Sequence, residues 1–291
     1  MKEEALLFGQ RQALIGVVTW PPVLQRSPAL PAVLLLNAGI LHRVGPNRTY
    51  VKIARSLAAL GSVVLRFDFS GIGDSVARDD TLPFDQASIQ EVQEAMATLH
   101  AAAGSAQFVL MGLCSGARTS FQAAVSDPRV VGAVLINPIS HLHDDRDQEL
   151  GAALRNRALL HHFRRIALFS SFRAKNWPKL LTGNLNHALL GQTIRGLRLR
   201  AEPAPTEYAR AQLRALSARG VHLLHIYSEG DEGLDYFRLL LGKEADAPPV
   251  ELIRGANHTF TPLWSQARLV QVLVEWMQRT YGTDGRLDAH T

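Results

Sequence analysis

The sequence predicts an α/β protein with a mostly parallel, twisted sheet and helices on both of its faces. Short apolar runs alternate along the chain with longer segments of helical periodicity, which is typical of strands joined by crossover helices. Polar or glycine-rich turns follow several of these runs, where the carboxyl ends of the strands would lie. With 291 residues, 47% of them hydrophobic, the chain is long enough for one large domain that carries an insertion.

The strand signals are short apolar runs, several of which are bounded by proline or glycine. We expect strands at 13–19, 32–36, 62–67, 108–111, 130–136, 221–227 and 250–253. Helices are expected at 50–60, 117–125 and 264–281, and around a fourth segment in which Ile89, Val92, Met96 and Leu99 repeat at helical spacing.

One long segment interrupts this alternation. Residues 141–205 contain no strand signal and are mostly compatible with helix. Because they lie between two expected strands, we expect a helical cap inserted over the carboxyl edge of the sheet. The predicted organisation is a core of residues 1–140 and 206–291 with a cap of residues 141–205.

The most informative motif is Gly-Leu-Cys-Ser-Gly at 112–116, between an expected strand and an expected helix. The central residue of Gly-x-nucleophile-x-Gly lies on a sharp strand-to-helix turn, and the two glycines let strand and helix approach closely. Cys114 is the only cysteine of the chain, and a helix N-terminus favours its thiolate. The motif predicts a cysteine hydrolase or acyltransferase. The alternative nucleophile, Ser115, would spoil the glycine spacing.

A cysteine nucleophile needs a base, and the base needs an orienting acid. In a sheet of this kind they follow in the order nucleophile, acid, histidine. Asp231 comes after the sixth expected strand and His258 after the seventh, so both would lie at carboxyl strand ends, as Cys114 does. Rivals of Asp231, each of which could instead be a solvated loop charge, are Glu229, Glu232 and Asp235.

Together these motifs resemble the α/β-hydrolase superfamily, in its capped serine-aminopeptidase-like branch. The resemblance extends from Ala13 to the C-terminal helix and includes Arg-Phe-Asp-Phe-Ser-Gly-Ile-Gly-Asp-Ser at 66–75, which matches the family's Asp-x-x-Gly-x-Gly-x-Ser turn. The chain is similar to the small hydrolases associated with bacterial exosortase systems, which share a cysteine-containing elbow. By that analogy alone, a role in processing bacterial surface polymers or exported proteins is implied.

Two positions depart from the pattern of this family. The elbow holds Cys114 where serine hydrolases have serine, and the segment after the strand at 32–36 reads Asn-Ala-Gly-Ile where the family usually has His-Gly. By position, the resemblance implies that the backbone N–H groups of Gly39 and Ser115 stabilise the oxyanion, with Ile40 as the alternative to Gly39. Asn37 is a candidate brace for this loop.

The predicted function is that of an acyl hydrolase or thioesterase, which acts on an ester or thioester through Cys114, His258 and Asp231 and a covalent acyl-enzyme. An acyl-cysteine also suits transfer to an acceptor, so an acyltransferase or a cyclising, lactone-forming enzyme remains open. Polyester synthases and dienelactone hydrolases resemble this chain in having cysteine at the elbow. The alternative from another class is a non-catalytic protein that binds an acyl ligand.

The expected cap is strongly basic, because residues 151–201 contain no Asp or Glu. Such a pattern indicates either a solvated helix face or an electropositive rim that attracts coenzyme A, a phosphopantetheine arm or an acidic acyl-carrier protein. The candidate contacts are Arg164, Arg165, Arg173 and Lys175. No recognition motif accompanies the charge, so we expect no nucleic-acid partner. The apolar cap positions are expected to line an acyl pocket rather than to face a membrane.

The remaining features restrict compartment and cofactors. A single cysteine excludes an internal disulfide and a cysteine metal cluster, and it fits a reducing compartment. Neither a signal peptide nor an uncharged apolar run of about 20 residues is apparent, so a cytoplasmic protein is predicted. The segment at 141–145 begins like a His-x-His-x-Asp zinc motif, but Arg146 stands where a further histidine is expected. No metal or other cofactor is predicted.

Overall fold

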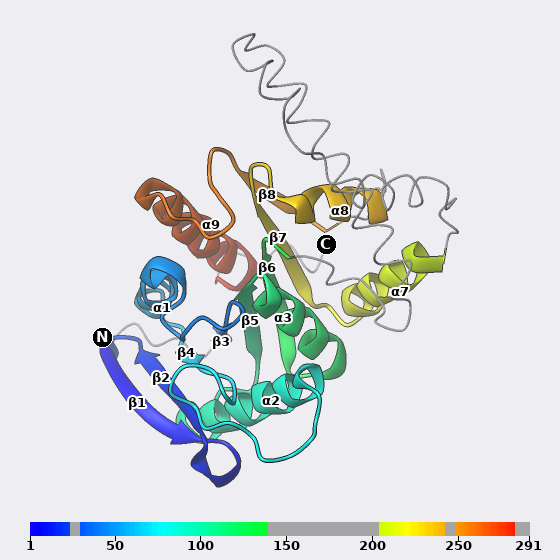
Figure 1. The fold of residues 1–291 in the computed structure, drawn as a ribbon. Coiled ribbons are helices and arrows are strands. Elements are labelled where there is room, and N and C mark those ends of the chain that lie inside the picture. Colours follow the sequence, from blue (N-terminus) through cyan, green and yellow to red (C-terminus); the bar gives the residue numbers. More distant parts are fainter. Residues whose placement is uncertain (24–29, 139–203, 242–247, 283–291) are drawn as a thin grey trace, which may run out of the picture. The chain divides into compact units, whose positions relative to one another are not determined.

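The computed structural model describes residues 1–23, 30–138, 204–241 and 248–282 (Figure 1). The strands are β1 (Lys2–Phe8), β2 (Leu14–Trp20), β3 (Ala32–Leu36), β4 (Val64–Phe67), β5 (Phe108–Leu113), β6 (Val130–Ile136), β7 (His222–Ser228) and β8 (Val250–Ile253). The helices are α1 (Thr49–Ala59), α2 (Phe84–Ala103), α3 (Ser115–Ser126), α7 (Ala204–Ala218), α8 (Glu232–Leu241) and α9 (Leu263–Tyr281), and single 3₁₀ turns lie at Gln10–Gln12 and Pro46–Arg48.

The chain divides into two compact units. The first, which we call the sheet unit, comprises Met1–His141, Arg214–Glu229 and Pro248–Thr291. The second comprises Leu142–Leu213 and Gly230–Ala247.

The sheet unit is built on one eight-stranded sheet in the order β1-β2-β4-β3-β5-β6-β7-β8. β1 pairs antiparallel with β2, and β2 with β4, whereas all the other neighbours are parallel. The expected mostly parallel sheet is thus confirmed. Every residue of β3 and β5 is buried, which explains why these strands read as unbroken apolar runs.

Helices cover both faces of this sheet. In Figure 1, α1 and α9 lie together on one face, and α2 and α3 lie together on the other. α9 buries one stripe of side chains spaced three and four residues apart, and these include Leu269, Val272, Leu273, Trp276 and Met277. α2 likewise buries Val92, Met96 and Leu99. The expected C-terminal helix and the expected amphipathic helix are thus both confirmed.

The sequence did not predict β1. Its first residues, Lys-Glu-Glu, have low strand propensity, and most of the strand is exposed at the edge of the sheet. β1 pairs with β2 along its whole length, from Lys2 opposite Trp20 to Phe8 opposite Leu14. Glu3 also forms ion pairs with Arg55 of α1 and the buried Arg66 of β4. These partners are distant in sequence, so local periodicity does not reveal them.

α8, in the second unit, was not expected either. Leu234, Tyr236 and Phe237 are buried on it, whereas no helix was predicted between Asp231 and the last expected strand. Asp235 was considered as a solvated loop charge. That interpretation is wrong, because Asp235 is a buried residue within this helix.

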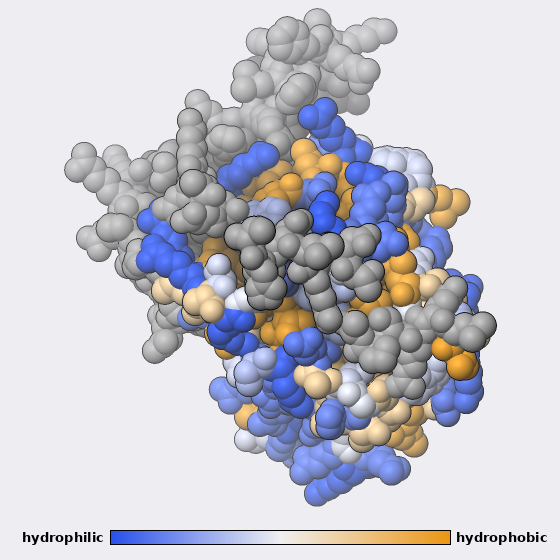
Figure 2. Space-filling view, turned by 180° about the vertical axis from the view of Figure 1, so that it is seen from behind, coloured by the Kyte–Doolittle hydropathy of each residue, from blue (hydrophilic) through white to orange (hydrophobic). Residues whose placement is uncertain are grey.

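The predicted cap falls almost entirely outside the described residues, and with it Arg164, Arg165, Arg173, Lys175 and the motif at 141–145. Among the helices that are described, none combines the length and apolar character needed to cross a membrane. Figure 2 shows hydrophilic and hydrophobic residues intermixed over the coloured part of one face. Scattered apolar residues of this kind are normal on protein surfaces and do not by themselves indicate an interface.

Candidate active site

Cys114 occupies the sharp turn between β5 and α3. Its φ of 58° and ψ of −115° are rare for an L-residue, so the turn stores backbone strain. The Cys114 N–H donates to the carbonyl of Ile136 on β6 at 2.9 Å, and its carbonyl accepts from the Ala117 N–H at 3.1 Å. Ser115 is already the first helical residue. The turn is therefore centred on Cys114, whose partly buried thiol lies at the N-terminus of α3.

The two glycines of the elbow are required by close packing. A Cβ at Gly112 would overlap the backbone of Gly116. A Cβ at Gly116 would lie 2.5 Å from the carbonyl oxygen of Asn37 and 2.6 Å from that of Leu36. The elbow thus packs directly against the end of β3, and this contact explains the glycine spacing in the sequence.

The oxyanion loop, which we define as residues 37–41, follows β3 and approaches the elbow. Gly39 has a φ of 58° within a tight turn, in which the Leu41 N–H donates to the Ala38 carbonyl at 3.1 Å. The Gly39 N–H donates to Ser115 Oγ at 2.7 Å. The structure therefore brings Gly39 and Ser115 together, with the Gly39 N–H already engaged. The Ile40 side chain projects into solvent.

Asn37 braces this loop. Its buried Nδ2 donates to the Leu41 carbonyl at 2.7 Å and to Asp68 Oδ1 at 3.2 Å. Its Oδ1 accepts from the Phe69 N–H at 2.9 Å. One amide thus connects both ends of the oxyanion loop to the turn that follows β4.

Asp68 opens that turn, and its fully buried carboxylate collects several donors. Besides Asn37, it accepts from the backbone N–H of Arg43 at 2.5 Å, from the Arg43 guanidinium, and from the Asp74 N–H at 3.2 Å. A Cβ at Gly73 would overlap the Asp68 carboxylate, which accounts for a glycine in the motif. Ser75 Oγ completes the turn by donating to the Asp68 carbonyl at 2.7 Å.

Tyr50 joins the two strands that carry the oxyanion loop and the elbow. Its buried hydroxyl donates to the carbonyl of Leu36, the last residue of β3, at 2.8 Å. The same oxygen accepts from the N–H of Leu113, the last residue of β5, at 2.9 Å. Burial raises the pKa of Tyr50, so the hydroxyl remains protonated and keeps both bonds. No periodicity in the sequence marks this residue.

His258 lies partly buried in the loop between β8 and α9. Its carbonyl accepts from Asn137 Nδ2 at 2.8 Å, while Asn137 Oδ1 accepts from the Ser228 N–H at 2.7 Å. The Asn137 N–H donates to the Ile226 carbonyl at 2.7 Å. Asn137 is fully buried, directly follows β6 and has a φ of 43°. A single side chain therefore connects the end of β7 to the loop of His258.

Asp231 follows β7 and belongs to the second unit. It is buried, and its Oδ1 accepts from the Gly233 N–H at 2.9 Å, which is the bond of a helix N-cap on α8. Among its rivals, Glu232 begins α8. Glu229 is exposed, and its Oε2 accepts from the Gly255 N–H at 2.8 Å, so it contacts the backbone of the loop that leads to His258.

Comparison with known proteins decides the family. A model of the α/β hydrolase family matches residues 33–272. The chain belongs to the α/β-hydrolase family. No curated protein sequence matches it.

Solved structures of other α/β hydrolases resemble this chain over nearly its whole length. Proline iminopeptidase from Mycobacterium smegmatis is 18% identical with a TM-score of 0.56, and the match covers 96% of this chain and 98% of that one. A serine hydrolase homologue from Coxiella burnetii is 13% identical (TM-score 0.55; 94% and 97% covered). The α/β hydrolase GrgF from Penicillium is 16% identical (TM-score 0.57; 97% and 99% covered). Identities this low show a common fold and do not extend to substrates.

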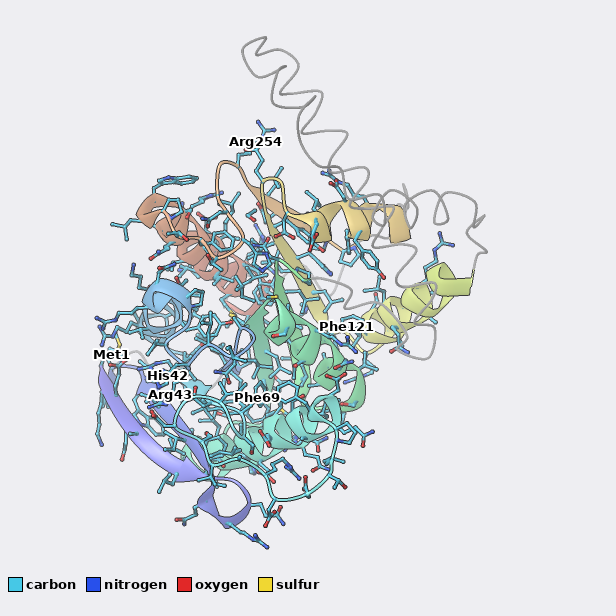
Figure 3. All side chains as sticks on the ribbon, in the orientation of Figure 1. Met1, His42, Arg43, Phe69, Phe121 and Arg254 are labelled. Carbon is cyan, nitrogen blue, oxygen red and sulfur yellow. The ribbon has the colours of Figure 1, made fainter. Side chains whose placement is uncertain are left out.

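In this α/β hydrolase, one described cluster has the composition of a metal site. His42, Asp68 and Asp74 bring their ligand atoms within 4.8 Å of one another. Arg43, next to His42 in Figure 3, places its Nη1 against both carboxylates, 2.8 Å from Asp74. Its hydrogen bond, together with that of His42, lowers the pKa of Asp74. The cluster is thus an ion-pair network in which a guanidinium supplies the positive charge.

A pocket of about 440 Å³ lies between the 3₁₀ turn of the β1–β2 hairpin and the segment that follows the turn at 68–75. Its charged residues pair with one another, as in Arg11 with Asp79 at 2.9 Å and Arg78 with Glu91 at 3.3 Å. Neither the elbow nor the oxyanion loop lines it. This pocket is therefore separate from the candidate active site.

Proposed function

We propose that this α/β hydrolase cleaves an ester or thioester through an acyl intermediate on Cys114. The observation that carries the proposal is the position of the only cysteine, at a strained strand-to-helix turn. The thiol lies at the N-terminus of α3, and Gly39 and Ser115 meet beside it. Strain at such a turn is typical of a residue that must project its side chain towards substrate.

In the proposed reaction, His258 accepts the Cys114 thiol proton or holds a preformed thiolate, and Asp231 orients the imidazole. Sγ forms a bond to the acyl carbon, and the carbonyl electron pair moves to the oxygen, which the oxyanion donors stabilise. His258 returns the proton to the departing thiolate or alkoxide as its bond to carbon breaks. Water then attacks the acyl thioester, releases the carboxylic acid and restores Cys114.

The His258 and Asp231 assignments draw support from the elements that hold them. His258 follows β8, and its carbonyl is anchored to Asn137, which follows the strand next to the elbow strand. Asp231 follows β7, the strand between β6 and β8. Acid and base thus leave the carboxyl ends of neighbouring parallel strands, where open α/β sheets place their sites.

The finer features of the proposal concern residues 141–205. We take them to form a cap on a core of residues 1–140 and 206–291, as in the capped serine-aminopeptidase-like branch and the exosortase-associated hydrolases that the cysteine elbow resembles. Their basic residues, among them Arg164, Arg165, Arg173 and Lys175, would attract an anionic carrier of the acyl group. Coenzyme A and an acidic acyl-carrier protein are the carriers with suitable charge.

The first experiment measures the rate of iodoacetamide alkylation against pH, with intact mass as the readout. Because the chain has one thiol, the signal reports Cys114 alone. We expect His258→Ala to slow alkylation near neutral pH by about tenfold or more, since the thiolate loses its partner. His100→Ala, a change at an exposed histidine at the end of α2, is the matched control and should leave the profile unchanged. Identical profiles for all three proteins would contradict the role of His258.

The second experiment exposes the protein to short and medium acyl thioesters. A mass increase of one acyl group is expected in the wild type and not in Cys114→Ala. An adduct mapped to Ser115 would show that Ser115, and not Cys114, is the nucleophile. Binding of the thioester without any adduct would indicate the non-catalytic alternative. If an added alcohol or amine discharges the acyl-enzyme faster than water does, the protein is an acyltransferase or a cyclising enzyme rather than a hydrolase.

A further inference from the structure

Ser115 differs from the other hydroxyl residues of α3 in how its side chain is used. Thr119 and Ser120 donate their hydroxyl protons to the carbonyls four residues earlier, and Ser126 donates to the carbonyl of Ala123. Ser115 Oγ instead accepts a hydrogen bond from the Gly39 N–H at 2.7 Å. Within the described part of the chain, its own proton is donated to no acceptor.

This hydrogen bond fixes where the Ser115 proton can point. Oγ faces the Gly39 N–H, so its O–H is directed away from the oxyanion loop. A hydroxyl that accepts a hydrogen bond also becomes a stronger donor, because the two bonds polarise one another. Ser115 is exposed, adjoins Cys114 and is the first residue of α3, where backbone N–H groups have no partner within the helix. Ser115 thus offers two donors beside the thiol.

We infer that the Ser115 hydroxyl is itself a catalytic residue of the oxyanion hole, an inference that rests on the acyl chemistry proposed above. As Cys114 Sγ adds to the carbonyl carbon, the developing oxyanion accepts hydrogen bonds from the Ser115 N–H and the Ser115 Oγ–H. The hydroxyl proton stays on Ser115 throughout. The Gly39 N–H does not touch substrate and instead holds and polarises the hydroxyl.

The competing arrangement has the opposite consequence. If the hydroxyl rotated away, the substrate oxygen would take its place on the Gly39 N–H, and Ser115 would act only as an obstacle. Ser115→Ala would then expose the Gly39 N–H and preserve or raise the acylation rate. If the hydroxyl is a donor, the same substitution removes a stabilising bond from the transition state and lowers that rate.

The test follows acyl-adduct formation by rapid quench and intact mass in the wild type, Ser115→Ala and Ser115→Thr. We expect Ser115→Ala to lower the maximal acylation rate about 100-fold, as for loss of one oxyanion donor, with little change in the half-saturating thioester concentration. Ser115→Thr keeps a hydroxyl and should remain within about tenfold of the wild type. A rate in Ser115→Ala that equals or exceeds that of the wild type would overturn the inference.

Alkylation by iodoacetamide provides the internal control. The thiolate displaces iodide from a saturated carbon, so no oxyanion forms and Ser115→Ala should alkylate like the wild type at every pH. Equal losses in alkylation and acylation would show a structural role and refute the catalytic one. A wild type that alkylates normally but forms no acyl adduct would instead contradict the proposed function, and the inference with it.

Discussion

The two sides of the elbow are held by different kinds of bond. On the oxyanion side, the buried Asp68 carboxylate gathers Asn37 and Arg43 and so fixes the loop that carries Gly39. On the histidine side, the neutral amide of Asn137 connects backbone groups of Ser228 and His258. One anchor is a charge and the other is an amide dipole.

Because of this difference, we expect the Asp68 anchor to contribute mainly to folding stability and the Asn137 anchor mainly to the position of the His258 loop. Removing a buried charge leaves its partner without compensation, which costs several kcal/mol of folding free energy. Removing an amide that links two backbone groups costs less but releases the segment it positioned. We therefore expect substitutions on the oxyanion side to act mainly on unfolding, and substitutions on the histidine side to act mainly on the reaction. A substitution on either side that acts mainly in the opposite way would contradict this division.

Asp68→Asn is expected to have the largest effect. The substitution keeps the shape of the side chain but leaves the mostly buried Arg43 guanidinium, among the described residues, with the exposed Asp74 as its one acidic partner. We expect the free energy of unfolding, measured with urea, to fall by about 3 to 5 kcal/mol. Asp79→Asn, which removes an exposed partner of Arg11, is the control and should cost at most about 1 kcal/mol. Equal effects of the two substitutions would contradict a buried charge as the anchor.

Asn137→Asp should affect the reaction more than the fold. Asp still accepts from the Ser228 N–H, but it cannot donate to the His258 carbonyl and places negative charge against it. We expect acylation of Cys114 to slow about 100-fold, the effect of a displaced catalytic group, with a loss of about 1 to 3 kcal/mol in the free energy of unfolding. Asn47→Asp, at an exposed asparagine that also has positive φ, controls for the added charge. An unchanged acylation rate in Asn137→Asp would show that the His258 loop does not depend on this amide.

Whether the sequence could predict a residue of the site depends on how far along the chain its partners lie. The elbow and the turn at 66–75 are local motifs, and a Cβ at Gly73, Gly112 or Gly116 would overlap atoms within or beside them, so both were recognisable. Asn37 was found because it stands inside the oxyanion loop. Tyr50 and Asn137 act through bonds to residues 36, 113, 228 and 258, far from them in sequence. A polar residue directly after an apolar strand was the only local signal for Asn137, and Tyr50 gave none.

The smallest expected effect is a loss of folding stability in acid, and it arises on the histidine side, in the strand β7 that ends at Ser228. His225 is completely buried on β7, and burial lowers its pKa to about 3. Below about pH 6.5 the unfolded chain binds a proton that the folded chain does not, so this histidine stabilises the fold above that pH and the contribution is lost as pH falls towards 3. Between about pH 7 and pH 5 the loss should reach about 2 kcal/mol.

His225→Gln, which cannot titrate, should flatten the dependence of the unfolding free energy on pH over this interval, whatever its effect at pH 7. Burial also lowers the pKa of His222, but His222 is present in both proteins, so the difference between their slopes isolates His225. Hydrogen bonds from Arg55 and Arg129 lower the pKa of Glu3 and Asp127 respectively, so in the folded state these carboxylates take up protons only below their ordinary range. If the unfolding free energies of the wild type and His225→Gln depend on pH with the same slope, another group takes up the proton. His225 on β7 would then not be the source of the acid sensitivity.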